Sequence, residues 1–260
     1  MCFLTVWTGV VTPSPACSRA LELCLSALGE EGHDLVPFTP PSPLRGLELA
    51  SQLLLADGGK VATSPFRWGE KNELGLNQMM RAFYTPNWIK YLWSLWYKWT
   101  GDNVFATLIR GWRKQTTAEY QGLVVQREKY KADFLQAWED AHLDFLITVP
   151  NATPAVPHDA LKDTFSNCGY TFLFNLIDYP AGVFPVTKVD AALDALPLNF
   201  KAKNRIEANT YKHYDAAKMA GLPVGVQVVG PRLEEERVLR AMEVVQGALH
   251  KAGVVYEMMA

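Results

Sequence analysis

The sequence predicts an α/β protein, and three observations lead to that class. Short apolar runs rich in branched residues, which are typical of buried strands, occur at residues 144–150, 183–189 and 222–230. Helical patterns lie between and after these runs, at 118–141 and 233–253. With 260 residues and 49% hydrophobic residues, the chain is long enough for one large domain with a sizeable core. We therefore expect a sheet that carries helices on its faces.

The first element is the apolar run "MCFLTVWTGVV" (1–11), which predicts a strand. It has no basic region and no small-residue cleavage site, so it does not match a secretory signal. A strand that starts at the first residue indicates that upstream sequence is missing. Apolar residues at helical spacing over 20–28 predict a helix that Gly32 ends, and "DLVPF" (34–38) predicts a second strand. This order indicates a βαβ unit, although the sequence leaves the strand direction open.

Charge and cysteine usage narrow the function classes. A net charge of −2 argues against a nucleic-acid partner and gives no overall attraction to anionic membranes. The four cysteines include no Cys-x-x-Cys pair, so we predict no metal site, and Cys17 and Cys24 are expected to pack in the core of a cytoplasmic protein. The histidines are scattered, and His158–Asp159, in a proline-rich loop, is interpreted as a turn.

The stretch "NWIKYLWSLWYKW" (87–99) holds four of the eight tryptophans and predicts a hydrophobic cap helix over 86–100. At helical spacing, Lys90, Ser94 and Lys98 form a narrow polar stripe between apolar residues. The helix would be about 18 Å long, too short for a hydrocarbon core of about 30 Å. It is either buried, in the core or in a homodimer interface, or it lies in the plane of a membrane with its lysines reaching the headgroups. The residues expected to contact the membrane are Trp88, Leu92, Trp93, Trp96 and Trp99.

Catalytic motifs are absent from the sequence. It contains no GxSxG, GxxxxGK[ST], GxGxxG or HExxH, and neither an adjacent serine pair nor a glycine-serine-rich loop. We therefore predict no cofactor and assign no catalytic residue.

Several ordered blocks resemble the C-terminal half of the amidase signature family. These are "YTFLFNLIDYPAGVFPVT" and "GLPVGVQVVGPRLEEERVLRAMEVV", with "LLADGGK" and "LDFLITVPNATPAVPHDA" before them. The nearest branches are the fungal acetamidase-like enzymes and the fatty-acid amide hydrolases. The resemblance implies a mixed, twisted sheet sandwiched between helices, with residues 1–260 as the C-terminal part of one amidase domain.

The resemblance also implies a role for particular residues. Family members use a serine nucleophile, a second serine and a lysine base, all in an N-terminal half with no counterpart here, so the chain alone is predicted to be inactive. Pro180 would stop a helix beside the substrate cleft, and Gly182 would allow close backbone approach where the chain enters a central strand. The residues that would face or lie near the acyl channel are Leu55, Ile109, Trp112, Phe165, Cys168 and Phe172. The alternative for each of these is an ordinary place in the core.

These implications leave three functions open. The first is the substrate-cleft half of a serine amidase that hydrolyses carboxylic or fatty-acid amides, with a small-molecule amide as partner and a peripheral membrane contact. The second is a non-enzymatic truncated product or an incomplete gene. The third is an amidotransferase subunit acting on charged tRNA, which the tryptophan-rich helix disfavours because it resembles the cap of lipid-amide enzymes.

Overall fold

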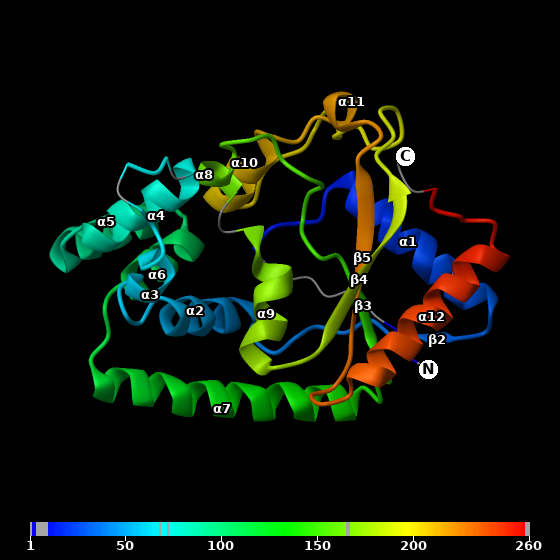
Figure 1. Cartoon of the computed structure of the whole chain (residues 1–260), viewed down its shortest axis with the longest axis horizontal. Helices are drawn as coiled ribbons and strands as arrows, with labels where there is room; N and C mark the ends of the chain where they lie inside the picture. Colours follow the sequence, from blue (N-terminus) through cyan, green and yellow to red (C-terminus); the bar gives the residue numbers. More distant parts are fainter. Residues whose placement is uncertain (1, 4–9, 68, 72, 165–166, 258–260) are drawn as a thin grey trace.

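A three-stranded antiparallel sheet, in the order β3–β5–β4, lies at the centre of the molecule (Figure 1). The computed structural model describes residues 2–3, 10–67, 69–71, 73–164 and 167–257. The central strands, all within or overlapping the predicted apolar runs, are β3 (Leu146–Thr148), β4 (Ala181–Lys188) and β5 (Pro223–Val229). β5 is the middle strand, and each of its neighbours pairs with it in antiparallel register.

A second, two-stranded sheet forms the predicted βαβ unit. β1 (Cys2–Phe3) and β2 (Asp34–Leu35) pair in parallel and are joined through α1 (Pro15–Glu30), which settles the strand direction that the sequence leaves open. Gly32 takes a positive φ of 80°, and the helix ends there as predicted. The rest of the predicted first strand, at residues 4–9, lies outside the described residues.

Helices make up most of the remaining described chain. Their bounds are α2 (Pro43–Leu54), α3 (Lys60–Thr63), α4 (Leu74–Tyr84), α5 (Asn87–Trp99), α6 (Asn103–Gly111), α7 (Thr117–Asp140), α8 (Leu161–Thr164), α9 (Gly169–Ile177), α10 (Arg205–Tyr211), α11 (Ala216–Met219) and α12 (Glu235–Lys251). α7 begins where it does because Thr116 and Glu119 form a capping box, in which each side chain accepts the other residue's backbone N–H.

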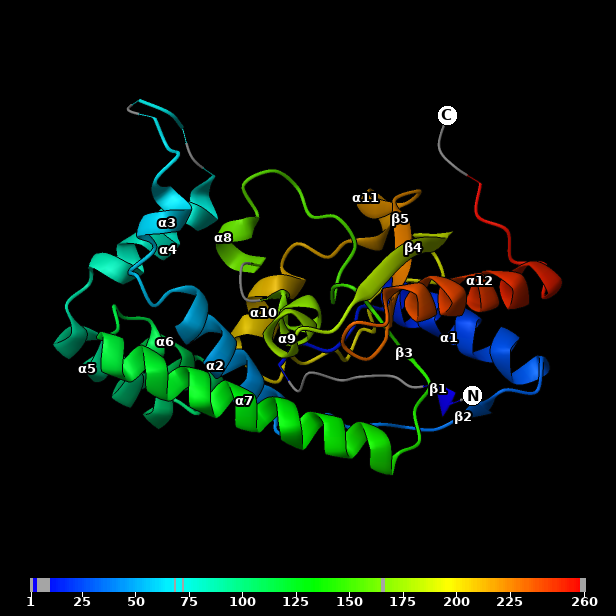
Figure 2. The same ribbon diagram turned by 60° about the horizontal axis from the view of Figure 1, so that its bottom comes forward.

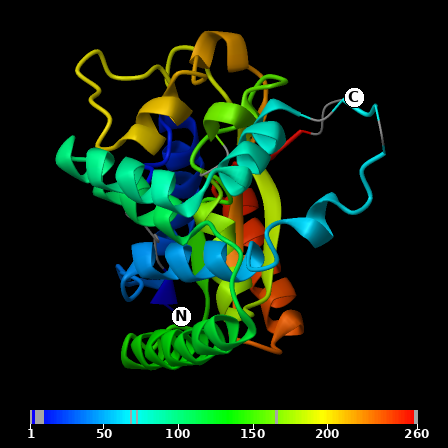
Figure 3. The same ribbon diagram turned by 90° about the vertical axis from the view of Figure 1, so that its left-hand side faces the viewer.

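Helical layers cover both faces of the central sheet, as expected. α1 and α12 pack on each other and on β4 and β5, where Val224, Val226 and Val228 join their core. α2, α7 and α9 pack together on the other side, with Leu146 and Val229 in their core (Figure 2). α4, α5 and α6 form the end of the molecule opposite α12 (Figure 1) and face the viewer in Figure 3. The mixed α/β architecture is therefore confirmed.

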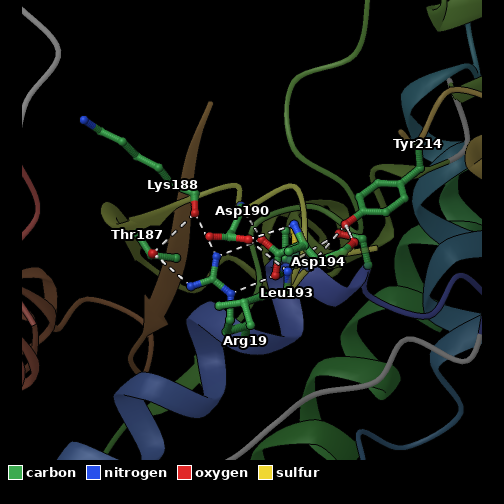
Figure 4. Close-up of polar contacts among 11 residues, drawn as sticks. Arg19, Thr187, Lys188, Asp190, Leu193, Asp194 and Tyr214 are labelled. Atoms are coloured by element: carbon green, nitrogen blue, oxygen red, sulfur yellow. Dashed lines mark hydrogen bonds and ion pairs between the residues drawn. The ribbon is translucent and has the colours of Figure 1, made fainter. Parts of the chain in front are cut away.

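An ion pair between a partly exposed arginine and a fully buried aspartate fastens α1 to the end of β4 (Figure 4). The Arg19 guanidinium donates to both carboxylate oxygens of Asp194 at 2.7 Å, and also to Thr187 Oγ1 and the Lys188 carbonyl. The Tyr214 hydroxyl donates to the Asp194 carbonyl at 2.7 Å. Burial would raise the pKa of Asp194, but the hydrogen bonds from Arg19 and from a backbone N–H hold it below its ordinary value. The two segments are 175 residues apart in sequence, so this contact closes a long loop.

The turn from α9 to β4 has the geometry that the sequence predicts. α9 ends at Ile177, Asp178 takes a left-handed conformation with φ of 66°, and Pro180 follows. Gly182 is in close contact with α12, because a Cβ at this position would lie 2.1 Å from Met242 Sδ. Gly182 does permit a close approach, but the approaching group is a side chain of α12, so the expectation of a close backbone approach is wrong.

Cys17 and Cys24 are free thiols buried in the core, as predicted. Burial raises the pKa of each to about 12, so neither is a reactive thiolate. His158 and Asp159 lie exposed in a turn, which confirms that interpretation.

Candidate functional site

α5 presents its aromatic side to solvent and two residues of its polar stripe, Lys90 and Ser94, to the protein, while the third, Lys98, is exposed. Trp88 is 67% exposed and Trp99 is 84% exposed, whereas Lys90 is 2% exposed and Ser94 is also buried. The expectation of a helix buried in this chain's core is therefore wrong, and so is the expectation that Lys90 reaches outward to headgroups. Within the described residues, no helix is both long and apolar enough to cross a bilayer.

Lys90 explains this orientation. Its ammonium donates to the Trp112 carbonyl at 2.6 Å and to the Phe83 carbonyl at 3.4 Å. These carbonyls lie at the C-terminal ends of α6 and α4, where the helix dipoles are negative and a cation is favoured. Burial lowers the pKa of Lys90. By binding the ends of two helices, Lys90 fixes α5 with its tryptophans outward.

A cavity of about 310 Å³, which we call the α5 pocket, lies beside this helix. It is enclosed by α4, α5, α6, α8 and α10, which lie side by side (Figure 1). Its apolar wall consists of Trp93, Tyr97, Phe105, Ile109, Trp112 and Ile206. Three of these rings pack edge to face, with centroids 4.8 Å apart for Tyr97 and Phe105 and 6.1 Å apart for Phe105 and Trp112. The wall is thus preformed for an apolar ligand.

A second cavity of about 550 Å³, the loop pocket, lies along the segment 150–156. The short helix α8 separates the two cavities, because Lys162 and Asp163 line the α5 pocket while Leu161 and Thr164 line the loop pocket. The loop pocket also contains Asn167, whose Nδ2 donates to a threonine hydroxyl while its Oδ1 has no hydrogen-bond partner among the described residues. The loop pocket therefore keeps one free acceptor in a mostly apolar lining.

The structure distributes the predicted substrate residues over several places. Ile109 and Trp112 line the α5 pocket. Cys168 lines the loop pocket, where burial raises the pKa of its thiol. Leu55 is buried in a hydrophobic core. Phe172 packs against both of the hydrophobic cores that flank the central sheet. Phe165 lies outside the described residues. The described members of the set are therefore not brought together in one cavity of this chain.

All five residues expected to contact a membrane are exposed, as the outward face of α5 requires; they are Trp88, Leu92, Trp93, Trp96 and Trp99. Sequence reasoning missed three cations around the α5 pocket, Arg81, Lys162 and Arg205. They come from α4, α8 and α10, which are far apart in the sequence, and no spacing or motif connects them.

Comparison with known proteins identifies the family. A family model described as Amidase matches residues 4–239. This chain belongs to the amidase family. The acetamidase of Aspergillus oryzae is 29% identical over 91% of this chain, and fatty-acid amide hydrolase 1 of Sus scrofa is 30% identical over 90% of it. The chain spans 39% and 40% of the length of these two relatives.

A solved structure of a fatty acid amide hydrolase has the same fold. It superimposes with a TM-score of 0.75 and 20% identity, over 95% of this chain and 39% of the other. At this identity the likeness concerns the fold. The expected architecture and the expected family are both confirmed.

Proposed function

We propose that this chain forms the acyl-binding side of an amidase that hydrolyses amides of apolar carboxylic acids to the acid and an amine or ammonia. The observation that carries the proposal is the α5 pocket, whose aromatic and aliphatic wall suits an acyl chain. Family membership and a relative named acetamidase support the amidase activity, and a relative named fatty-acid amide hydrolase 1 supports the substrate class.

The nucleophile is proposed to come from residues outside this sequence. The sequence contains no adjacent serine pair and no glycine-serine-rich loop, which the resemblance requires for the nucleophile and for the oxyanion hole. The role of this chain is then to bind and orient the acyl group, because positioning is a large part of the catalytic effect.

The proposal also includes a membrane contact through α5. Trp93 belongs to both features, because it lines the α5 pocket and is 43% exposed on the aromatic face. A helix that rests on a bilayer through this face would therefore hold the pocket beside the lipid in which an apolar amide dissolves. Burying the face would contribute several kcal/mol at about 25 cal/mol per Å².

The test separates binding from hydrolysis. The purified 260-residue chain is mixed with oleamide or with acetamide, and tryptophan fluorescence and released ammonia are both followed. We expect oleamide to quench fluorescence because Trp93 and Trp112 line the pocket, acetamide to have no effect, and neither amide to yield ammonia above buffer. Absence of oleamide binding would contradict the acyl-binding role, and sustained ammonia release would contradict the external nucleophile.

A further inference from the structure

The α5 pocket has a second property that hydrolysis of a neutral amide does not use: its lining is strongly cationic. Arg81 lies in the last turn of α4, Lys162 belongs to α8, and Arg205 begins α10, so three separate elements each bring one positive charge to the same cavity. Among the described residues of the lining, the one carboxylate is that of Asp163, which contacts His213 Nε2 at 2.8 Å. Three cations therefore surround one carboxylate that already has a partner.

These cations are available to a ligand. In the part of the chain that the structure describes, none of the three side chains forms an ion pair with a protein carboxylate. Asp102 lies close to Arg205 but accepts its backbone N–H, at 3.2 Å. An anion in the pocket would therefore be attracted by three positive charges that the described carboxylates leave without an ion pair.

Arg205 is also held in place. Its guanidinium carbon lies 5.2 Å from the ring centroid of Tyr97 and 5.9 Å from that of Phe105, and both rings belong to the apolar wall. Stacking on aromatic faces is a preferred environment for arginine and leaves the edge of its planar group free to donate. Arg205 therefore stands where the apolar wall meets the cationic part of the lining.

From this arrangement we propose that the α5 pocket binds the carboxylate of a long-chain amphiphile, with the acyl chain against the aromatic wall and the carboxylate on Arg205, Arg81 and Lys162. This inference builds on the proposed function and deepens it. Two sources have the required chemistry: the free fatty acid that amide hydrolysis releases, and an N-acyl amino acid, which carries an amide and a carboxylate together. In the first case the amidase retains its product, and in the second the cations select its substrate.

The test compares ligands that differ only in charge. Oleate and oleamide have the same chain and nearly the same head shape, and their affinities for the 260-residue chain are measured by calorimetry below the concentrations at which they form micelles. We expect oleate to bind at least about tenfold more tightly, because hydrogen bonds between ionised groups are the stronger ones. Added salt should weaken oleate binding and leave oleamide binding nearly unchanged.

Variants assign the effect to the pocket. Arg205→Gln and the double variant Arg81→Gln with Lys162→Gln should each weaken oleate binding much more than oleamide binding, and so remove most of the preference for oleate. Arg240→Gln is the matched control, because Arg240 is an exposed arginine on α12 at the other end of the molecule. Far-ultraviolet circular dichroism checks that each variant keeps its fold, and oleamide binding serves as an internal check of the pocket.

A third ligand identifies the source of the carboxylate, and the binding results also show which of the two proposals fails. N-oleoylglycine that binds more tightly than oleate supports the N-acyl amino acid, and the reverse order supports the free acid. Equal binding of oleate and oleamide, unaffected by the glutamine variants, would overturn the carboxylate site while leaving the acyl-binding role in place. If neither ligand binds, both the carboxylate site and the proposed function are wrong.

Discussion

Lys90 shows how one side chain decides the orientation of a whole helix. Lys90 is almost fully buried and has no carboxylate partner in the described part of the chain, which is rare because removing the charge from water costs free energy. Here the carbonyl groups at the ends of α4 and α6 offset part of that cost. The sequence pattern predicts the position of Lys90 on the polar stripe, but not that Lys90 faces inward.

Removing Lys90 should weaken the fold and change its pH dependence. Lys90→Met keeps the apolar stem but takes away the donor to the Trp112 carbonyl, which should lower the free energy of unfolding by about 1–3 kcal/mol. In the wild type, the folded pKa lies below the unfolded value of 10.5, so the unfolded state binds more protons between these two values. The wild-type free energy of unfolding should therefore rise with pH across that window, relative to the variant.

Urea unfolding at a series of pH values up to 10.5 measures both effects. Lys98→Met is the control, because Lys98 is exposed on the same helix and should change stability by less than about 0.5 kcal/mol. A Lys90 variant with wild-type stability, or the same pH slope in both proteins, would show that Lys90 is not held as the structure has it.

At the scale of elements, α5 combines a prediction that is confirmed with one that is wrong. Its bounds, Asn87–Trp99, coincide with the predicted stretch, because a period of 3.6 residues is a local property that the sequence displays directly. Which side of the helix faces the protein depends on partners in α4 and α6, and periodicity alone is compatible with either side. Exposure of the tryptophans in this chain leaves two surfaces that could cover them: a membrane, or a second copy of the chain.

Vesicle binding distinguishes these two surfaces. The double variant Trp88→Ser with Trp99→Ser should reduce co-sedimentation with anionic vesicles by more than about tenfold, because it removes large apolar area from the contact. These two positions suit the test because neither lines the α5 pocket, whereas Trp93 does. The control double variant Val125→Ser with Leu239→Ser removes exposed apolar residues from α7 and α12.

The competing result is equally specific. If the tryptophan variant sediments with vesicles as the wild type does, and only its self-association in lipid-free buffer is lost, then α5 forms a dimer interface and the membrane contact is refuted.

At the scale of the whole molecule, the sequence predicts the class and the strands but not their pairing. β3 and β4 are both recognisable as apolar runs, yet β5, which follows both in the chain, lies between them. Pairing of that kind is non-local and leaves no periodic signal. The same holds for the cations of the α5 pocket, and for the Arg19–Asp194 pair, which joins residues 175 positions apart.

The Arg19–Asp194 pair should have a large effect on global stability. Arg19→Met leaves a fully buried carboxylate without its guanidinium, which should cost about 3–5 kcal/mol. In the wild type, the lowered pKa of Asp194 contributes stability that is complete above 3.8 and is lost as the pH falls through the lower folded pKa. In the variant, burial is no longer opposed by Arg19, so acid unfolding should begin at a higher pH.

Thermal unfolding as a function of pH measures this change. Arg240→Met removes an exposed ion pair with Glu243 and is expected to change the free energy of unfolding by less than about 1 kcal/mol. Equal effects of the two substitutions would mean that the buried pair is energetically no different from a surface pair.

Because Lys90 faces the protein and the tryptophans of α5 face solvent, different requirements limit which substitutions each position tolerates. Because Trp88 and Trp99 contribute little to the fold, a screen for folded protein alone would accept polar residues at both positions and reject most replacements of Lys90. A screen for the biological activity would reject changes at all three. Comparing the two sets of accepted residues would separate the part of α5 that maintains the fold from the part that serves whatever surface the protein meets.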